Sequence, residues 1–381
     1  LDGNSLGALP RHTSAHVERI VRQEWGRHLI GGWNLSWWQA PRRLGGLLAP
    51  LLGAQTDEVI VSDTISLNLF KLITYALRLH PERRVILSEG GNFPTDQYIA
   101  QGLATLLPGL MHRTIPAEAE DPAAWFGDDV AVAVLSHVNY RSGRLYDMED
   151  LTRRARARGL HLIWDLAHSA GALPLELNRC GVEFAVGCTY KYLNGGPGAP
   201  AFLYVRRDLQ GRTVQPLTGW FGHADPFTFE ADYRPAADIR QFLTGTHSAL
   251  AYGALEASLE LWQEVDLAAL RAKSLSLTGL FMELMRPLAA AHGLRLLTPA
   301  EPARRGSQVA YYRDTDGYAI IQALIARGVI GDFRAPGLLR FGFAPLYLSH
   351  ADVWQAVRHL REVLERGEYR DARFQRAEAV T

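Results

Sequence analysis

The sequence predicts an α/β protein: a mostly parallel β-sheet with helices on both faces, followed by a smaller α+β domain. From about residue 56, short apolar runs alternate with longer amphipathic ones, which is typical of strands and helices in a parallel sheet. After about Ala249 a long helical stretch replaces this alternation. The chain has 381 residues, of which 48% are hydrophobic and 21% charged, and this composition excludes an intrinsically disordered protein.

Apolar periodicity and turn residues locate the elements of the larger part. The predicted strands are 59–62, 85–88, 130–137, 162–165, 184–189 and 202–205. The predicted helices are 67–79, a helix from Asp96 onward, and one that opens at Asp147 and Asp150 as a capping pair and stops at Gly159.

The remainder of the chain divides into an N-terminal segment and a smaller C-terminal unit. After the helix from 249 to about 285, the pattern predicts strand 308–312, helix 318–327, strands 329–333 and 338–343, and helix 350–366. Residues 1–40 are turn-rich and contain four tryptophans. We therefore expect an N-terminal segment 1–40 that packs on the small domain and the active site, a large domain 41–250 and a small domain 251–381.

Charge and cysteine content exclude several classes of function. Forty basic residues balance forty acidic ones, so there is no basic surplus for nucleic acid or an anionic membrane. No run approaches the ~18 apolar residues of a membrane span. Cys180 and Cys188 are the two cysteines and make no disulfide framework, so we expect a reducing, cytoplasmic location. The histidines show no metal-ligand spacing, and no metal is expected.

Lysine is rare in this chain. Of the 40 basic residues 37 are arginine, and the three lysines are Lys71, Lys191 and Lys273. A lysine retained in an unusual setting is a candidate for chemistry that arginine cannot perform, because an amine can lose its proton and form a Schiff base. Lys191 follows an apolar strand, stands between two tyrosines and precedes a Gly-Pro-rich turn. Its residues alone leave two interpretations open, a Schiff-base lysine and a loop lysine paired with a carboxylate.

Two further groups of polar residues fall at predicted strand ends, where ligands of open parallel sheets bind. Asp165 ends a buried strand, with His168 three residues later. This aspartate either pairs with a protonated pyridine nitrogen or caps a helix, and His168 by itself is more typical of a packed, hydrogen-bonded histidine. Residues 62–68 form either an anion seat at a helix start or an ordinary Ser/Thr cap. The short separation of Asp165 and Lys191 favours a shared site.

An anion seat, then Asp165, then Lys191, in that order, resembles fold-type I pyridoxal 5'-phosphate enzymes, and within that class the kynureninase family. The matching segments are 1–7, 93–96, Asp165 with His168, 190–191, 219–223, 245–246, and 339–341 before 345–347. The resemblance runs from residue 1 to about 350. It implies a seven-stranded, mostly parallel sheet with helices on both faces, a large domain that binds pyridoxal phosphate, and a small C-terminal α+β domain.

The resemblance also implies roles for individual residues. Lys191 would hold the cofactor covalently, Tyr190 would reach its phosphate and relay a proton, and Asp165, supported by His168, would pair with the pyridine nitrogen. The other implied cofactor-binding residues are Ile65, Ser66, Phe93, Asp96, Trp220 and Thr246, the last two from the second subunit of a homodimer with shared sites. The implied substrate-binding residues are Arg340, which would bind the α-carboxylate, and Trp33, Ser5 and Gly245.

The activity implied by the resemblance is hydrolysis of L-kynurenine to anthranilate and L-alanine in tryptophan catabolism, the kynurenine pathway and NAD biosynthesis, with 3-hydroxykynurenine as the alternative substrate. Trp33 and the pair 245–246 resemble the bacterial pattern, which goes with kynurenine. A class V aminotransferase is the rival enzyme, and a non-catalytic binding protein of the same fold is the rival of another class. A cysteine desulfurase would need a nucleophilic cysteine on a C-terminal loop, and no cysteine follows Cys188.

Overall fold

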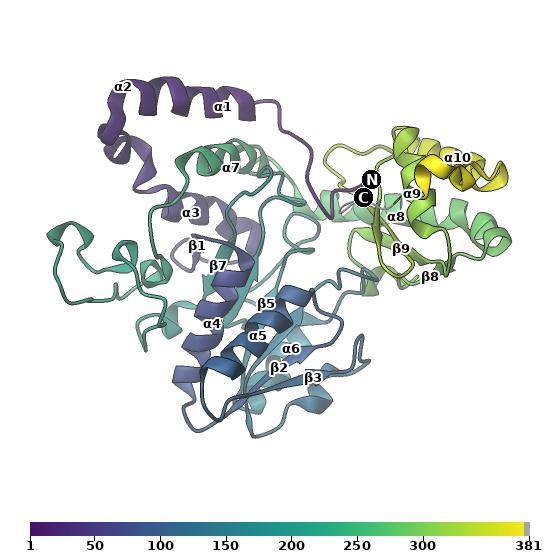
Figure 1. Cartoon of the computed structure of the whole chain (residues 1–381). Coiled ribbons are helices and arrows are strands. Elements are labelled where there is room, and N and C mark those ends of the chain that lie inside the picture. Colours follow the sequence, from purple (N-terminus) through teal and green to yellow (C-terminus); the bar gives the residue numbers. More distant parts are fainter. Residues whose placement is uncertain (377–381) are drawn as a thin grey trace.

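The computed structural model describes residues 1–376 and contains two β-sheets, each with its own covering helices (Figure 1). The strands of the large sheet are β1 (Val59–Val61), β2 (Val85–Glu89), β3 (Met111–Ile115), β4 (Val130–Ser136), β5 (His161–Asp165), β6 (Phe184–Gly187) and β7 (Phe202–Val205). Their spatial order is β1-β7-β6-β5-β4-β2-β3. Strand β7 is antiparallel to both of its neighbours, whereas β2 to β6 pair in parallel. The predicted seven-stranded, mostly parallel sheet is therefore confirmed.

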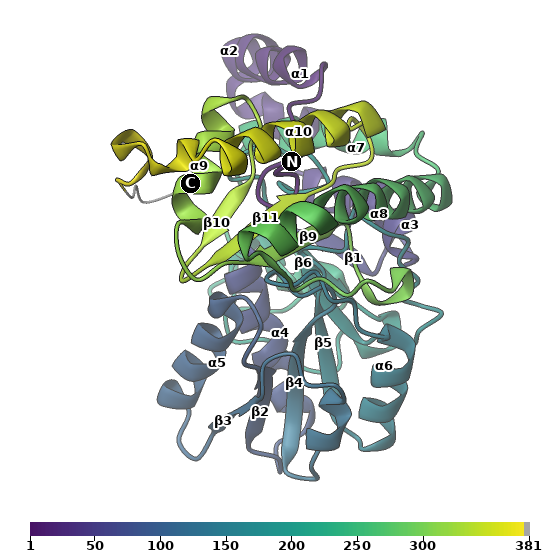
Figure 2. The same cartoon turned by 90° about the vertical axis from the view of Figure 1, so that its right-hand side faces the viewer.

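Helices cover both faces of this sheet. The helices of the first 262 residues are α1 (Thr13–Arg19), α2 (Gly26–His28), α3 (Ala40–Leu52), α4 (Ile65–Leu79), α5 (Pro94–Leu106), α6 (Met148–Ala157) and α7 (Ala249–Trp262). Apolar residues of α3, α6 and α7 form the core on one face, and those of α4 and α5 form the core on the other. Figure 2 shows α5 and α6 on opposite sides of the strands. Because both faces are covered, β1, β4 and β5 are buried along their whole length.

A second, antiparallel sheet lies in the C-terminal part. Its strands are β8 (Arg295–Leu296), β9 (Gln308–Tyr312), β10 (Asp332–Arg334) and β11 (Leu338–Gly342), in the order β10-β11-β9-β8. Helices α8 (Leu267–His292), α9 (Gly317–Ala326) and α10 (His350–Glu365) pack against it around a separate apolar core. This arrangement agrees with the expected smaller α+β unit.

Four expectations about the elements were wrong. The helix from 249 to about 285 is two helices, since the side chain of Asp266 accepts hydrogen bonds from the backbone N–H groups of Ala268 and Ala269 and starts α8. Strand 329–333 begins only at Asp332. Strand β3 was not predicted, because it is a sheet edge with exposed positions and no apolar run. Residues 1–40 are more helical than expected, as α1 and a following turn of helix reach Trp25.

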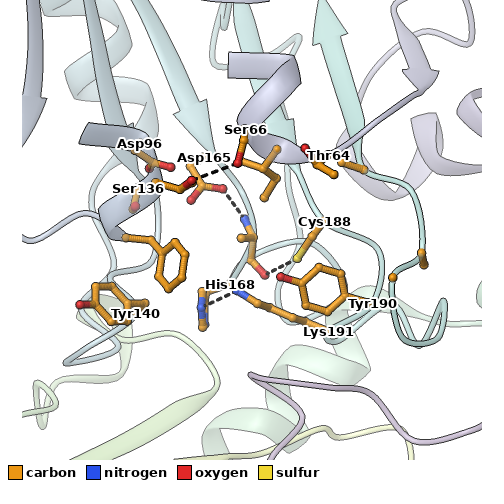
Figure 3. Close-up of a pocket in the computed structure, with 17 residues that line it drawn as sticks. Thr64, Ser66, Asp96, Ser136, Tyr140, Asp165, His168, Cys188, Tyr190 and Lys191 are labelled. Carbon is orange, nitrogen blue, oxygen red and sulfur yellow. Dashed lines mark hydrogen bonds between the residues drawn. The ribbon is translucent and has the colours of Figure 1, made fainter. Parts of the chain in front are cut away.

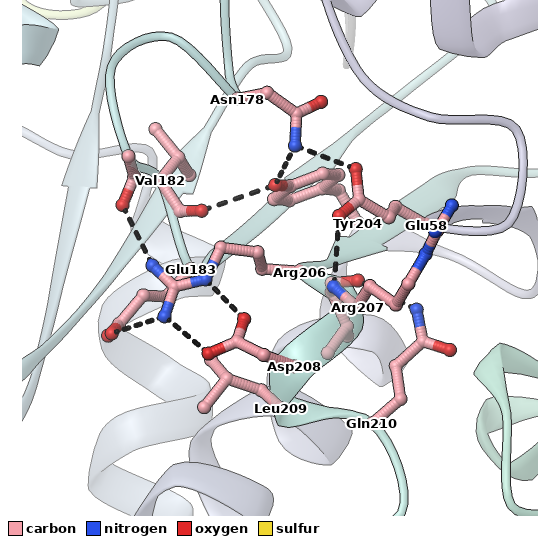
Figure 4. Close-up of polar contacts among 12 residues, drawn as sticks. Glu58, Asn178, Val182, Glu183, Tyr204, Arg206, Arg207, Asp208, Leu209 and Gln210 are labelled. Carbon is pink, nitrogen blue, oxygen red and sulfur yellow. Dashed lines mark hydrogen bonds and ion pairs between the residues drawn. The ribbon is translucent and has the colours of Figure 1, made fainter.

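A polar network fixes the strand pair β1–β7 at the end of the sheet away from the carboxyl ends of the parallel strands (Figure 4). The Glu58 carboxylate accepts hydrogen bonds from the backbone N–H of Arg207 at 2.9 Å and from the Asn178 amide at 2.9 Å. The hydroxyl of Tyr204 in β7 donates to the carbonyl of Val182 at 3.2 Å. These bonds satisfy the backbone and side-chain groups where β7 turns away from the sheet.

The N-terminal segment joins the two parts of the molecule. Asp2 forms a β-bridge with Gly342 at the end of β11. A few residues later, the backbone N–H of Gly7 donates to the carbonyl of Tyr190 at 2.8 Å, and the Asn194 amide donates to the carbonyl of Ala8 at 2.9 Å. The chain thus passes from the small sheet directly across the loop that carries Lys191.

Candidate active site

A cavity of about 230 Å³ lies at the carboxyl ends of the parallel strands (Figure 3). The residues that follow β1, β2, β5 and β6 reach it, because parallel strands end at the same edge of the sheet. Eight residues expected at a cofactor site line this cavity: Ile65, Ser66, Phe93, Asp96, Asp165, His168, Tyr190 and Lys191. The structure therefore brings together side chains that the sequence spreads over 127 positions.

Lys191 projects into the cavity from the loop after β6. Its Nζ lies 2.9 Å from Nε2 of His168. The same atom lies between two aromatic rings, 5.9 Å from the centroid of Phe93 and 5.8 Å from the centroid of Tyr190. A Cβ on Gly7 would come within 2.2 Å of the Lys191 carbonyl oxygen, so only glycine permits the N-terminal segment to cross here. Burial, followed by the charge of Lys191, lowers the pKa of His168, which keeps this imidazole neutral.

Two carboxyl groups lie at the buried end of the cavity. Asp96 and Asp165 are 0% and 5% exposed. Oδ1 of Asp165 accepts a hydrogen bond from the backbone N–H of Ala167 at 2.9 Å, whereas Oδ1 of Asp96 has no hydrogen-bond partner within residues 1–376. Burial raises the pKa of both groups, and the charge of Asp165 raises that of Asp96 further. A ligand with a protonated ring nitrogen would supply the missing donor and the compensating charge.

An anion seat lies at the other side of the cavity, where α4 begins. Thr64 is the N-cap of α4, and its Oγ1 accepts a hydrogen bond from the backbone N–H of Leu67 at 3.4 Å. The Ser66 hydroxyl lies 3.0 Å from the Thr95 hydroxyl in the first turn of α5. Free N–H groups and two hydroxyls at a helix N-terminus suit a phosphate group. The carboxyl pair, the amine and this seat together fit pyridoxal phosphate.

Aromatic side chains form the walls between these groups. Phe93 and Tyr140 contact each other edge to face, with ring centroids 5.4 Å apart, and Phe93 is 46% exposed. Burial, with a further contribution from Cys188, raises the pKa of Tyr190, so its phenol stays protonated near neutral pH. Tyr140, Ser136 and Thr95 line the cavity but were not among the expected site residues. Ser136 ends β4, so the strand-end rule that pointed to Asp165 could have found it.

Arg340 and Ser5 lie behind the cavity wall rather than in it. Arg340, in β11, donates from Nη1 to the Tyr140 carbonyl at 2.7 Å, and the Asp332 carboxylate binds its Nε at 2.6 Å and its Nη2. Ser5 donates to the same carboxylate. The bidentate contact orients the guanidinium of Arg340. Nη2 also donates to the Ser5 hydroxyl at 3.4 Å, so that, among the described residues, one N–H of Nη1 is left for a further anion.

Trp33, Trp220, Gly245 and Thr246 do not line the cavity of their own chain. Trp33 packs against Phe221 with ring centroids 5.7 Å apart, and Trp220 is 38% exposed. Gly245 and Thr246 are exposed. Within one copy of the chain, these four residues are thus separate from the cavity around Lys191.

The described residues contain neither a candidate metal-binding cluster nor a candidate membrane-spanning helix. Within residues 1–376, no group of three or more His, Cys, Asp or Glu side chains is arranged to hold a metal ion. No helix in this part of the chain is long and apolar enough to cross a membrane.

Solved structures with this fold define the class of protein. A complex of the cystine C-S lyase C-DES with cysteine persulfide superimposes with a TM-score of 0.81 at 21% identity, covering 94% of this chain and 96% of that one. The cysteine desulfurase of Thermococcus onnurineus NA1 gives a TM-score of 0.78 at 17% identity, covering 96% and 94%. The fold is that of the fold-type I pyridoxal-phosphate enzymes.

Sequence relatives are much closer. The kynureninase of Deinococcus radiodurans is 51% identical over 96% of this chain and 90% of its own length, and that of Pseudomonas fluorescens is 48% identical over 100% and 92%. A family model described as the kynureninase C-terminal domain matches residues 270–360. The chain belongs to the kynureninase family.

Proposed function

We propose that this protein is a kynureninase: it hydrolyses L-kynurenine to anthranilate and L-alanine, with pyridoxal 5'-phosphate as cofactor. The main observation in support of this proposal is the position of the Lys191 amine, which lies in a cavity lined also by a buried pair of carboxyl groups and by the N-terminus of a helix. The identity of about half with kynureninases over nearly the full chain supports it.

Each end of the cavity suits one end of the cofactor. Ile65 and Ser66 would bind the phosphate at the start of α4, Phe93 would cover the ring, and Asp165 with Asp96 would hold the ring nitrogen. When bound, the cofactor supplies an electron-withdrawing ring that accepts the electron pair released at the substrate α-carbon.

The chain's own groups then bind the substrate and move protons. Arg340 would bind the substrate α-carboxylate through Nη1, whose second N–H has no partner within residues 1–376. The Nζ of Lys191, hydrogen-bonded to His168, is placed to remove and return the proton at the substrate α-carbon. The Tyr190 phenol, which stays protonated, would donate a proton at the ketone oxygen as water adds to the carbonyl carbon.

We further propose a homodimer with shared sites. Trp220 and Thr246, with Trp33 and Gly245, would complete the cavity of the second subunit, since they lie outside the cavity of their own. The segment around Trp220 exposes Phe227 and Phe229 by 60% and 78%, which supports burial against another chain.

The cytoplasm is the proposed location. The two cysteines do not form a disulfide with each other, in keeping with a reducing compartment. A role in tryptophan degradation, or in supplying a precursor of NAD, would follow from the proposed reaction.

The test is an assay with L-kynurenine on the pyridoxal-phosphate-loaded protein beside Lys191→Ala and Lys273→Ala. Lys273 is the matched control because its Nζ donates to the Pro345 carbonyl at 2.6 Å, away from the cavity. We expect anthranilate fluorescence from the wild type and from Lys273→Ala but none above background from Lys191→Ala.

Other products would point to other activities. Conversion of the cofactor to its amine form with a keto-acid requirement would identify an aminotransferase and overturn the proposal. Turnover of 3-hydroxykynurenine in preference to kynurenine would correct the substrate while keeping the reaction.

A further inference from the structure

Lys71 is the first of the three lysines along the chain and has no part in the proposed reaction. It lies in α4 with a fully buried side chain. Its Nζ makes three hydrogen bonds, to the Asp63 carboxylate, to the Ser62 hydroxyl at 3.2 Å and to the Phe242 carbonyl at 2.6 Å. All three ammonium protons are therefore used, and none points into the cavity.

Asp63 is the partner residue and shapes the turn between β1 and α4. Its backbone has φ of +48°, a left-handed conformation that costs energy for a residue with a side chain. The surroundings hold it there, since its carbonyl accepts from Ala201 N–H at 2.9 Å and its carboxylate accepts from the Ser62 hydroxyl at 2.6 Å. The cavity residues Thr64, Ile65 and Ser66 follow directly, so this turn sets the direction in which the anion seat opens.

The same pair also holds a second segment. The Thr244 hydroxyl donates to the Asp63 carboxylate at 3.3 Å, and Lys71 binds the Phe242 carbonyl two residues earlier. Gly245 and Thr246 come next in the chain. The backbone N–H of Phe221 donates to the Thr244 carbonyl at 3.1 Å, which ties the turn beside Trp220 to the same point.

The chemistry of the pair explains why lysine is kept here. Three acceptors surround one point, and a compact ammonium fits that arrangement whereas a planar guanidinium does not. Burial lowers the pKa of Lys71, an effect that Asp63 opposes. Burial works to raise the pKa of Asp63, but the charge and hydrogen bond of Lys71 outweigh it and lower that pKa. Such an ion pair, with the ammonium buried and the carboxylate partly exposed, adds little net stability but holds a defined geometry.

We propose that Lys71 and Asp63 are positioning residues for the cofactor phosphate. The ion pair of the buried Lys71 with the partly buried Asp63 locks the β1–α4 turn onto the segment 242–244, and so holds the residues 64–66 in the arrangement that binds a phosphate. This inference rests on the proposed function only in taking a phosphate-bearing cofactor as the ligand.

The experiment compares pyridoxal phosphate with pyridoxal, which lacks the phosphate, as ligands of the apo-protein. Dissociation constants are measured by fluorescence quenching for wild type, Lys71→Met, the double variant Lys71→Met/Asp63→Asn, and the control Lys273→Met. We expect the two Lys71 variants to bind pyridoxal phosphate at least about tenfold more weakly, because charge-assisted hydrogen bonds to the phosphate are misplaced. Pyridoxal affinity should change less than about twofold, as should both affinities of Lys273→Met.

The double variant keeps the test decisive if Lys71→Met does not fold, because it leaves no unpaired buried charge. Equal weakening for both ligands would overturn the proposal in favour of a general structural role. A double variant that binds pyridoxal phosphate as tightly as the wild type does would overturn the proposal as well. The kynurenine assay on the wild type decides the proposed reaction separately, since phosphate preference is measured without turnover.

Discussion

Asp96 and Asp165 place two carboxyl groups at the closed end of one cavity, an arrangement that a protein without a ligand does not favour. Oδ1 of Asp96 is buried and finds no donor in the described part of the chain, and the neighbouring carboxylate adds repulsion. Such local instability is typical of a site built for a charged ligand rather than for the empty protein. The pair therefore connects the stability of the apo-protein to pH.

Asp96→Asn is expected to stabilise the apo-protein, and more so as the pH rises. Because the pKa of Asp96 is raised by burial, the folded state holds a proton that the unfolded state loses, and wild-type stability falls as the pH increases towards the raised value. An amide carries no such charge. Urea unfolding of both apo-proteins at pH 5 and pH 8 should give a gain of order 1–3 kcal/mol at pH 8, the usual cost of an unsatisfied buried polar group, and less at pH 5.

Loading with pyridoxal phosphate should reverse this order at pH 8. A protonated ring nitrogen held by the two carboxylates would stabilise the wild type, whereas the neutral amide of the Asp96→Asn variant would offer that nitrogen less opposite charge. An apo-protein whose stability is unaffected by the substitution at either pH would show that Asp96 is ionised without penalty, contrary to its burial.

The relative positions of individual residues could be predicted where a single rule applied. Strand ends of a parallel sheet meet, and this placed Asp165, Lys191 and the start of α4 together. The contacts of Arg340 with Asp332 and of Lys71 with Phe242 follow no such rule, because they join segments whose approach depends on packing. Tyr140 was not predicted because it comes from a loop with no periodicity.

At the scale of elements, strongly periodic segments were located to within a few residues. Strand β7 has the predicted bounds, and α10 ends within a residue of them. Errors arose where one side chain decides an element, as Asp266 does between α7 and α8. Apolar residues of α7 lie in the core of the large sheet, whereas those of α8 from Leu277 onward lie in the other core. We therefore propose a large and a small domain whose cores separate within α8, later than residue 250.

Helix α10 offers a test of how much one cap contributes to the small domain. The Ser349 hydroxyl accepts from the backbone N–H of Asp352 at 3.2 Å, and the Asp352 carboxylate accepts from the backbone N–H of Ser349 at 2.7 Å. Ser349→Ala removes the first bond, so we expect a loss of about 1 kcal/mol in the free energy of unfolding. Urea denaturation followed by circular dichroism measures it.

Ser349→Thr is the matched control, because threonine also caps helices and keeps the hydroxyl that donates to the Asp352 carboxylate at 2.7 Å, so it should keep most of the stability. Equal losses in both variants would mean that loss of the capping hydroxyl does not explain the effect of Ser349→Ala.

At the scale of the whole molecule, the segment 217–235 projects from the large domain, at the left of Figure 1 and far from the small domain. It carries Trp220 with the exposed rings of Phe227 and Phe229. Contiguous exposed aromatic groups are unusual on a monomer and typical of an interface. In the proposed dimer this segment and Thr246 would reach the cavity of the other subunit.

Mixing two inactive variants tests whether the site is shared. Lys191→Ala removes the amine, and Trp220→Ala/Thr246→Ala removes the groups proposed to act across the interface, so each homodimer should have little activity. A heterodimer of the two would hold one cavity with Lys191 from one subunit and Trp220 and Thr246 from the other, all intact. Random pairing makes half of the dimers heterodimers, each with one working site, so co-expression should restore about a quarter of the wild-type activity. If each site were built within a single chain, the mixture would show only the average of the two variants, and Trp220 and Thr246 would lose their proposed role.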